Sequence, residues 1–219
     1  MKKQNINKGF FITFEGPEGS GKSTQVKLLA EFLDSEGISY ILTREPGGTD
    51  FAEKIRGILK DTSLNKVLSL KTEALLFQAA RAQHVFEKIK PALKDGKIVI
   101  CDRYADSSTV YQGEARGLGK KEIEALNYFS TDNLNPDLTI LMDIDPETGL
   151  SRAHIRENCS LEKDRFEEQG LSFHKKIREA FLRLASEHPS RYRIINASDE
   201  VSVIHNKIIH ILRDEFKLF

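Results

Sequence analysis

The chain has 219 residues, a length that suits one α/β domain with a hydrophobic core of its own. Its 33 Lys and Arg residues equal its 33 Asp and Glu residues, so the formal net charge is zero. A nucleic-acid-binding scaffold would show a basic excess or stripe, so that class is disfavoured, whereas small anionic ligands need only a few local charges.

Nothing in the sequence indicates export or membrane insertion. The two cysteines, Cys101 and Cys159, form neither a metal-type cluster nor a disulfide framework. The N-terminal apolar run is too short for a signal peptide, and no segment reaches the roughly 20 apolar residues that a membrane helix needs. We therefore expect a soluble, cytoplasmic protein that binds neither nucleic acid nor membrane.

Short β-rich apolar runs alternate with stretches of helical periodicity along the whole chain. Strands are predicted at 10–14, 39–43, 97–101, 138–142 and 193–195. Helices are predicted at 23–36, 51–59, 71–93, 121–130, from 146, up to about 187, and at 201–216, the third of them bent or broken before Pro91. Gly113, Gly117 and Gly119 predict a loop-rich patch after the third strand. This alternation predicts an α/β fold with a parallel sheet covered by helices on both faces.

The first predicted strand leads directly into Gly16-Pro-Glu-Gly-Ser-Gly-Lys-Ser23, which matches the phosphate-binding P-loop in full. Its glycines let successive backbone N–H groups point at phosphate oxygens, and the following helix directs its positive end there. Lys22 is expected to reach the β- and γ-phosphates of ATP, and the Ser23 hydroxyl to bind Mg²⁺. The alternative, a chance glycine turn, is weak because the flanking strand and helix are both present. The expected ATP-binding residues are Gly16, Pro17, Glu18, Gly19, Ser20, Gly21, Lys22, Ser23 and Thr24.

Asp102 and Arg103 follow the third predicted strand. An aspartate in this position of a P-loop protein holds Mg²⁺. By itself an aspartate at a strand end is more often a turn or cap residue, but the upstream P-loop reverses that preference. Arg103 offers a planar fork that suits phosphate oxygens, with a surface salt bridge as its alternative.

Two further features have a plain alternative. Phe77 and Arg81 are four residues apart on a predicted helix and could stack on and hydrogen-bond a flat heterocycle. From spacing alone, the more plausible interpretation is a core phenylalanine with an exposed arginine beside it. The charged stretch that contains Arg152 and Arg156 is either a solvated surface or a lid that brings positive charge over the γ-phosphate.

Taken together, the motifs resemble thymidylate kinase of the bacterial type, a P-loop nucleoside monophosphate kinase family. The resemblance rests on FEGPEGSGKST (14–24), TREPGGT (43–49), LFQAAR (76–81), DRYADSS (102–108), YQG (111–113), NPDL (135–138) and DRFE (164–167), in the family's order. It implies a three-layer P-loop NTPase fold with a five-stranded parallel sheet, as a single domain over 1–219 with a lid at about 147–166. It also implies a homodimer that phosphorylates dTMP to dTDP with ATP and Mg²⁺, in dTTP biosynthesis.

The resemblance assigns roles to individual residues. Phe77 would stack on thymine and Arg81 would donate to its O4, while Glu18 would face the acceptor sugar. The substrate-binding set would be Glu18, Glu45, Arg56, Phe77, Arg81, Arg103, Ser108, Tyr111 and Gln112, with Arg56 and Arg103 on the acceptor phosphate and Tyr111 near the 2′ position. Ser23 and Asp102 would hold Mg²⁺. The catalytic residues would be Lys22, Arg103, Arg152 and Arg156.

One departure leaves a question open. Family members of the other type carry an arginine in the P-loop where this chain has Gly19, so the catalytic positive charge must come from elsewhere, with the lid arginines as the obvious source. The lid stretch at 156–164 is longer than in compact members, which leaves the exact lid arginine open. Three alternative functions also remain: a kinase for dUMP or thymidine, an ATP-binding module without acceptor-dependent turnover, and a nucleic-acid-processing ATPase, which the zero net charge disfavours.

Overall fold

The computed structural model describes residues 9–64, 67–157, 170–215 and 217–218. Its centre is a sheet of five strands, β1 (Phe10–Glu15), β2 (Tyr40–Arg44), β3 (Ile98–Asp102), β4 (Leu138–Asp143) and β5 (Tyr192–Asn196). All neighbouring strands pair in parallel, in the order β2-β3-β1-β4-β5. The predicted five-stranded parallel sheet is therefore confirmed, and each strand boundary lies within one residue of its prediction.

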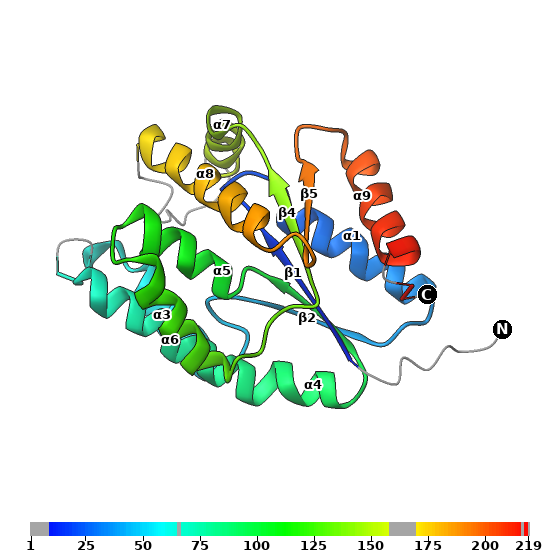
Figure 1. Ribbon diagram of the computed structural model, residues 1–219, viewed down its shortest axis with the longest axis horizontal. Helices are drawn as coiled ribbons and strands as arrows, with labels where there is room; N and C mark the ends of the chain where they lie inside the picture. Colours follow the sequence, from blue (N-terminus) through cyan, green and yellow to red (C-terminus); the bar gives the residue numbers. More distant parts are fainter. Residues whose placement is uncertain (1–8, 65–66, 158–169, 216, 219) are drawn as a thin grey trace.

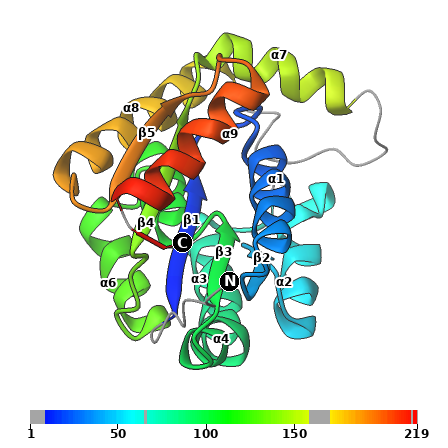
Figure 2. The same cartoon turned by 90° about the vertical axis from the view of Figure 1, so that its right-hand side faces the viewer.

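Helices cover both faces of this sheet (Figures 1 and 2). They are α1 (Lys22–Ser35), α2 (Asp50–Lys60), η1 (Thr62–Leu64), α3 (Leu70–His84), η2 (Val85–Ile89), α4 (Lys90–Lys94), α5 (Ala105–Ser108), η3 (Thr109–Ala115), α6 (Lys120–Thr131), α7 (Pro146–Glu157), α8 (Leu171–Glu187), α9 (Val201–His210) and η4 (Ile211–Glu215). In Figure 1, α1 and α9 lie on one side of the strands and the helices from α3 to α6 on the other.

Side chains along a strand point alternately to the two faces of the sheet, and helices cover both faces, so the apolar strands are buried on both sides. Ile12 and Phe14 of β1 pack in one cluster with residues of α1 and α9, whereas Phe11 packs with η2 and α4 on the opposite face. A strand covered on both sides needs a continuous apolar run rather than an alternating one, which is the pattern seen in the sequence.

Two predictions about helices have different outcomes. The irregularity predicted before Pro91 is confirmed, because the π-helical turn η2 ends at Ile89 and Pro91 stands in the first turn of α4. The loop-rich patch predicted after the third strand is wrong for residues 105–115, which form α5 and η3, whereas Gly117 and Gly119 do lie in the non-helical connection to α6. Gly113 serves packing rather than a turn: a Cβ there would lie 3.3 Å from the Gly119 carbonyl oxygen at the start of α6.

The carboxyl ends of the strands lie at one edge of the sheet, where ligands bind in open α/β folds. Glu15 ends β1 directly before the P-loop, Asp102 ends β3 and Asp143 ends β4. Polar and charged residues thus gather where the apolar strands stop. Among the described residues, no helix combines the length and apolar character needed to cross a membrane.

Candidate active site

The P-loop, residues 16–21, connects β1 to α1 in a turn that needs glycine at position 19. Gly19 has a left-handed φ of 69°, and a Cβ on it would come within 1.9 Å of the carbonyl oxygen of Gly149 in the first turn of α7. This backbone therefore excludes any side chain at position 19, including the arginine of the other family type. The sequence-based inference that positive charge comes from elsewhere has a steric reason here.

Lys22 lies inside the P-loop rather than in solvent. Its ammonium Nζ donates to the carbonyl oxygens of Gly16 at 3.0 Å and Pro17 at 2.8 Å, and to Ser20 Oγ at 3.2 Å. Burial of the amine, with the nearby charge of Arg103 as a second cause, lowers the pKa of Lys22 to about 8. The loop therefore holds a buried cation against its own carbonyl oxygens.

Ser23, in the first turn of α1, meets Asp102 at the end of β3. The Ser23 hydroxyl donates to Asp102 Oδ2 at 2.7 Å. Two hard oxygen ligands suit Mg²⁺, which takes few protein ligands and completes its shell with phosphate oxygens and water. No group of three or more His, Cys, Asp or Glu suited to a metal occurs among the described residues.

Arg103, Glu18 and Tyr111 form a cluster beside the P-loop. Arg103 has a left-handed φ of 68°, and its Nη2 donates to Glu18 Oε1 at 2.7 Å while its Nη1 donates to the Gly16 carbonyl oxygen at 3.1 Å. The Tyr111 hydroxyl donates to the same Glu18 oxygen at 3.2 Å, and burial raises the pKa of this phenol, so it keeps the proton that it donates. The Arg103 guanidinium carbon lies 5.2 Å from the Tyr111 ring centroid, within range of a cation–π contact. Glu18 thus faces the segment after β3.

Glu15, at the end of β1, holds the turn beside this cluster in place, and the sequence analysis did not identify it. The side chain is fully buried and accepts hydrogen bonds from the Tyr104 backbone N–H at 2.8 Å and from Ser107 Oγ at 2.6 Å. Burial, followed by the nearby charge of Asp106, raises the pKa of Glu15 to about 7. Because Ser107 Oγ also accepts from Arg103 Nη1 at 3.2 Å, Glu15 fixes the turn that carries Arg103. The sequence feature that could have indicated this role is a carboxylate placed between an apolar strand and a glycine-rich loop.

Arg81 lies in the centre of a buried network on α3. Its exposed fraction is 2%, so the interpretation from spacing alone, an exposed arginine beside a core phenylalanine, is wrong. All five N–H donors of the Arg81 guanidinium form hydrogen bonds within the protein. Their acceptors are Glu45 Oε2 at 2.7 Å, Gln78 Oε1 at 3.1 Å, Asn127 Oδ1 at 2.9 Å, the Tyr104 carbonyl oxygen at 3.2 Å and Ser108 Oγ at 3.0 Å.

Glu45 is buried as the partner of Arg81 and His84. Its Oε2 accepts from Arg81, and its Oε1 lies 3.1 Å from His84 Nδ1. On the other side of the imidazole, His84 Nε2 lies 2.6 Å from Thr43 Oγ1. Arg56 of α2 donates from Nη1 to the Pro46 carbonyl oxygen at 2.9 Å, so it lies against the same loop after β2.

The remaining residues of the predicted base pocket lie around α3. Phe77 is half-buried and packs against the cluster that joins α2 and α3. Ser108 contacts Arg81, and Gln112 of η3 donates from Nε2 to Glu73 Oε1 at 3.1 Å. The structure therefore brings Ser108 and Gln112 to the helix that carries Phe77 and Arg81.

The predicted lid is described only in part. Arg152 is exposed on α7 and donates from Nη1 to the Ala197 carbonyl oxygen at 2.9 Å. Arg156 belongs to the same helix, but its side chain lies outside the described residues, as do residues 158–166 of the predicted lid.

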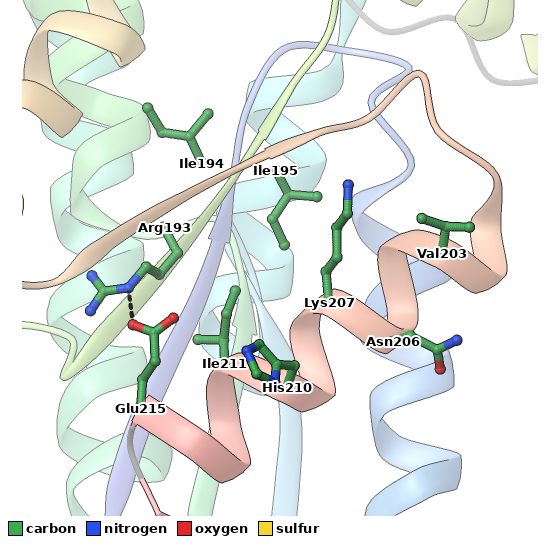
Figure 3. Close-up of a pocket in the computed structure, with 9 residues that line it drawn as sticks. All are labelled: Arg193, Ile194, Ile195, Val203, Asn206, Lys207, His210, Ile211 and Glu215. Carbon is green, nitrogen blue, oxygen red and sulfur yellow. Dashed lines mark hydrogen bonds and ion pairs between the residues drawn. The ribbon is translucent and has the colours of Figure 1, made fainter.

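A groove of about 610 Å³ lies elsewhere, between β5 and α9 (Figure 3). Charged side chains on its lining are paired within the protein, Arg193 with Glu215 and Lys207 with Asp199. None of the predicted site residues lines it, so it is separate from the P-loop site. Its lining residues are Arg193, Ile194, Ile195, Val203, Asn206, Lys207, His210, Ile211 and Glu215.

Comparison with known proteins agrees with this geometry. The family model described as thymidylate kinase matches residues 14–208, which include the P-loop and the α3 face. The chain belongs to the thymidylate kinase family. It is 46% identical to the thymidylate kinase of Clostridium novyi (strain NT), over 95% of this chain and 100% of that one. It is 45% identical to that of Bacillus velezensis, over 95% and 97% of the two chains.

A solved structure shows the same fold. The crystal structure of thymidylate kinase from Ehrlichia chaffeensis superposes with a TM-score of 0.76 at 34% identity, over 94% of this chain and 99% of that one. Thymidylate kinases are phosphotransferases, and the family reaction is the ATP-dependent phosphorylation of dTMP to dTDP.

Proposed function

We propose that this protein transfers the γ-phosphoryl group of ATP to the phosphate of dTMP, giving ADP and dTDP, with Mg²⁺ as cofactor. The observation that carries the proposal is the continuous chain of contacts from the P-loop through Glu18 and Arg103 to Tyr111, because it joins a polyphosphate site to the segment beside the α3 face. A kinase for a phosphorylated acceptor needs two anion-binding sites that face one another in this way.

On the donor side, the P-loop amides and Lys22 would bind the ATP phosphates, with residues 16–24 forming the site. Lys22 would exchange its three loop acceptors, which are all neutral oxygens, for phosphate oxygens. Ser23 and Asp102 would hold Mg²⁺, whose role when bound is to neutralise charge that develops on the phosphate oxygens.

On the acceptor side, Phe77 would stack on the thymine ring, with Arg81, Ser108 and Gln112 along the edges of the base. Arg81 would turn one of its five donors toward O4, so base binding exchanges a protein acceptor for a ligand acceptor. The acceptor phosphate would lie between Arg56 and Arg103, with Glu45 holding Arg81 in place. Glu18 and Tyr111 would border the sugar, where Tyr111 crowds a 2′-hydroxyl.

The chemistry requires positioning and charge rather than a strong base, because the nucleophile is already a phosphate oxygen anion. Lys22 and Arg103 would share the charge that spreads over the transferred group. Arg152 and Arg156 of α7 would add to it when the lid, at about 147–166, covers the donor. Because position 19 has no room for an arginine side chain, the arginines of α7 would supply this positive charge instead.

We further propose a homodimer of single-domain subunits that span residues 1–219. Helix α3 packs against both α2 and α6, and the three helices carry large apolar side chains that are exposed in the single chain. Burying such apolar surface against a second copy of the chain would remove it from water and so favour a dimer. These side chains are Phe51, Ile58, Leu75, Tyr128 and Phe129. A Phe129→Asp variant should elute as a monomer in light-scattering chromatography, whereas an unchanged dimer would exclude this face as the interface.

A reaction that consumes ATP also supports a cytoplasmic location.

An acceptor panel tests the proposed function. ADP release is measured with ATP, Mg²⁺ and either dTMP, dUMP, thymidine or dCMP. We expect dTMP to give the highest kcat/KM and thymidine, which lacks the acceptor phosphate, to give almost none. Turnover of thymidine above dTMP would assign a nucleoside kinase instead. ATP binding without ADP release for any acceptor would assign a non-catalytic P-loop module.

A further inference from the structure

Three residues of α3 lie on one face of the helix, because Glu73, Phe77 and Arg81 follow one another at intervals of four. Two of them are hydrogen-bonded to the segment formed by α5 and η3. Arg81 donates to Ser108 at 3.0 Å, and Glu73 accepts from Gln112 at 3.1 Å. Phe77 stands between these two contacts along the helix. The two contacts therefore border the surface on which a stacked base would lie.

The contact between Glu73 and Gln112 determines which way the amide of Gln112 faces. A carboxylate only accepts hydrogen bonds, so the amide must present its NH₂ group to Glu73. Nε2 is therefore committed, and the carbonyl oxygen Oε1 points away from the carboxylate. Gln112 as a whole is 2% exposed, and among the described residues its side chain makes the one hydrogen bond from Nε2 to Glu73.

Glu73 can keep this role because its charge is balanced inside the protein. It is 1% exposed, and Arg116 Nε lies 3.6 Å from its Oε1. The Arg116 guanidinium carbon also lies 5.5 Å from the ring centroid of Phe173 in α8, which limits its freedom. A buried carboxylate held by a cation and an amide is a fixed feature of the pocket wall.

We propose that Glu73 is a positioning residue that determines pyrimidine specificity, by holding Gln112 with its oxygen toward N3 of the acceptor base. The inference rests on the proposed function, since it requires the base to lie on Phe77. Thymine and uracil carry a hydrogen on N3 and can donate to this oxygen. Cytosine has an unprotonated N3, so two acceptors would face each other, an arrangement that leaves both groups without a partner.

The variant Glu73→Gln tests this role because it keeps volume and removes the constraint. An amide at position 73 can donate as well as accept, so Gln112 becomes free to present Nε2 to the base. We expect kcat/KM for dCMP to rise about tenfold, whereas kcat/KM for dTMP and dUMP falls by less than about threefold. A gain for dCMP is not produced by general loss of structure. Glu124→Gln, which removes an exposed carboxylate of α6, should change neither value.

A second variant addresses the possibility that Glu73→Gln folds poorly. Gln112→Met keeps the length of the side chain and removes the acceptor, so kcat/KM should fall about tenfold for dTMP and dUMP but stay within about threefold for dCMP. A dTMP-to-dCMP ratio equal to that of the wild type in both variants would overturn the inference. If the wild type itself fails to phosphorylate dTMP, it is the proposed function that fails instead.

Discussion

The donor and acceptor sides of the site are built in different ways. The proposed donor side is one continuous turn with a single lysine, and among the described residues that lysine bonds to neutral oxygens of its own loop. The acceptor side is a network of buried side chains from several elements, with Arg81 and Glu45 already paired. The first therefore contributes little to the stability of the fold, whereas the second contributes to both folding and binding. Substitutions should separate these two cases.

Lys22→Ala should give the largest effect on activity and leave the fold intact. Loss of the buried cation should lower kcat about a thousandfold, because charge on the transferred group loses a preorganised partner. The melting temperature should stay close to that of the wild type. Lys27→Ala removes an exposed lysine of the same helix and should leave kcat unchanged. Near-normal turnover of Lys22→Ala would contradict the assignment of the donor side.

Arg81→Met should instead act on stability. Removing the guanidinium leaves the buried Glu45 carboxylate without its strongest partner, which costs about 3–5 kcal/mol in the free energy of unfolding. Urea denaturation measures this loss. Arg44→Met, which breaks a largely exposed ion pair with Glu53, should cost less than about 1 kcal/mol. In folded Arg81→Met protein, KM for dTMP should rise far more than KM for ATP. Equal stability losses for the two variants would show that the network is not structural.

ATP affinity should decrease as the pH rises above about 8. Burial lowers the pKa of Lys22 to about 8 in the free protein, and contact with phosphate favours the ammonium form. Binding above that pH must therefore take up a proton, which weakens it by up to about tenfold per pH unit. Below pH 7 the lysine is already charged and this dependence disappears. Calorimetric titration of ATP between pH 6.5 and 9.5 checks the slope, which Lys22→Ala should lack.

Tyr111→Phe should give the smallest effect. The variant removes only the hydroxyl that donates to Glu18, a loss of about 1 kcal/mol, so kcat/KM for dTMP should fall about fivefold while KM for ATP stays constant. Tyr40→Phe, which removes an exposed hydroxyl bond to Asp34, is the matched control. A change confined to ATP kinetics would move Tyr111 from the acceptor side to the donor side.

The same contrast explains what the sequence could predict. The P-loop was identified from eight consecutive residues because all of its ligand-binding groups belong to one turn. The burial of Arg81 was not predicted from spacing, because its partners Glu45 and Asn127 are 36 and 46 residues away in the chain. Helical periodicity reports which residues share a face but not what covers that face.

Two other features escaped prediction for physical reasons. Glycines at 113, 117 and 119 indicated a loop, yet Gly113 is inside η3, where it permits close packing against the start of α6. A single glutamate at the end of an apolar strand is usual at a turn, and only the fold shows that Glu15 is buried beneath Arg103. In both cases the local residue type was compatible with two environments, and tertiary packing selected one of them.

The contact between Gly19 and Gly149 restricts how this enzyme can change over evolution. Because the backbones of the P-loop and α7 touch at this point, neither position can gain a side chain unless the other segment moves. A chain built in this way cannot acquire a P-loop arginine through one substitution. Such a change would first require α7 to withdraw, and the arginines on that helix would withdraw with it, so a P-loop arginine and the catalytic charge that we propose for α7 would be alternatives rather than additions.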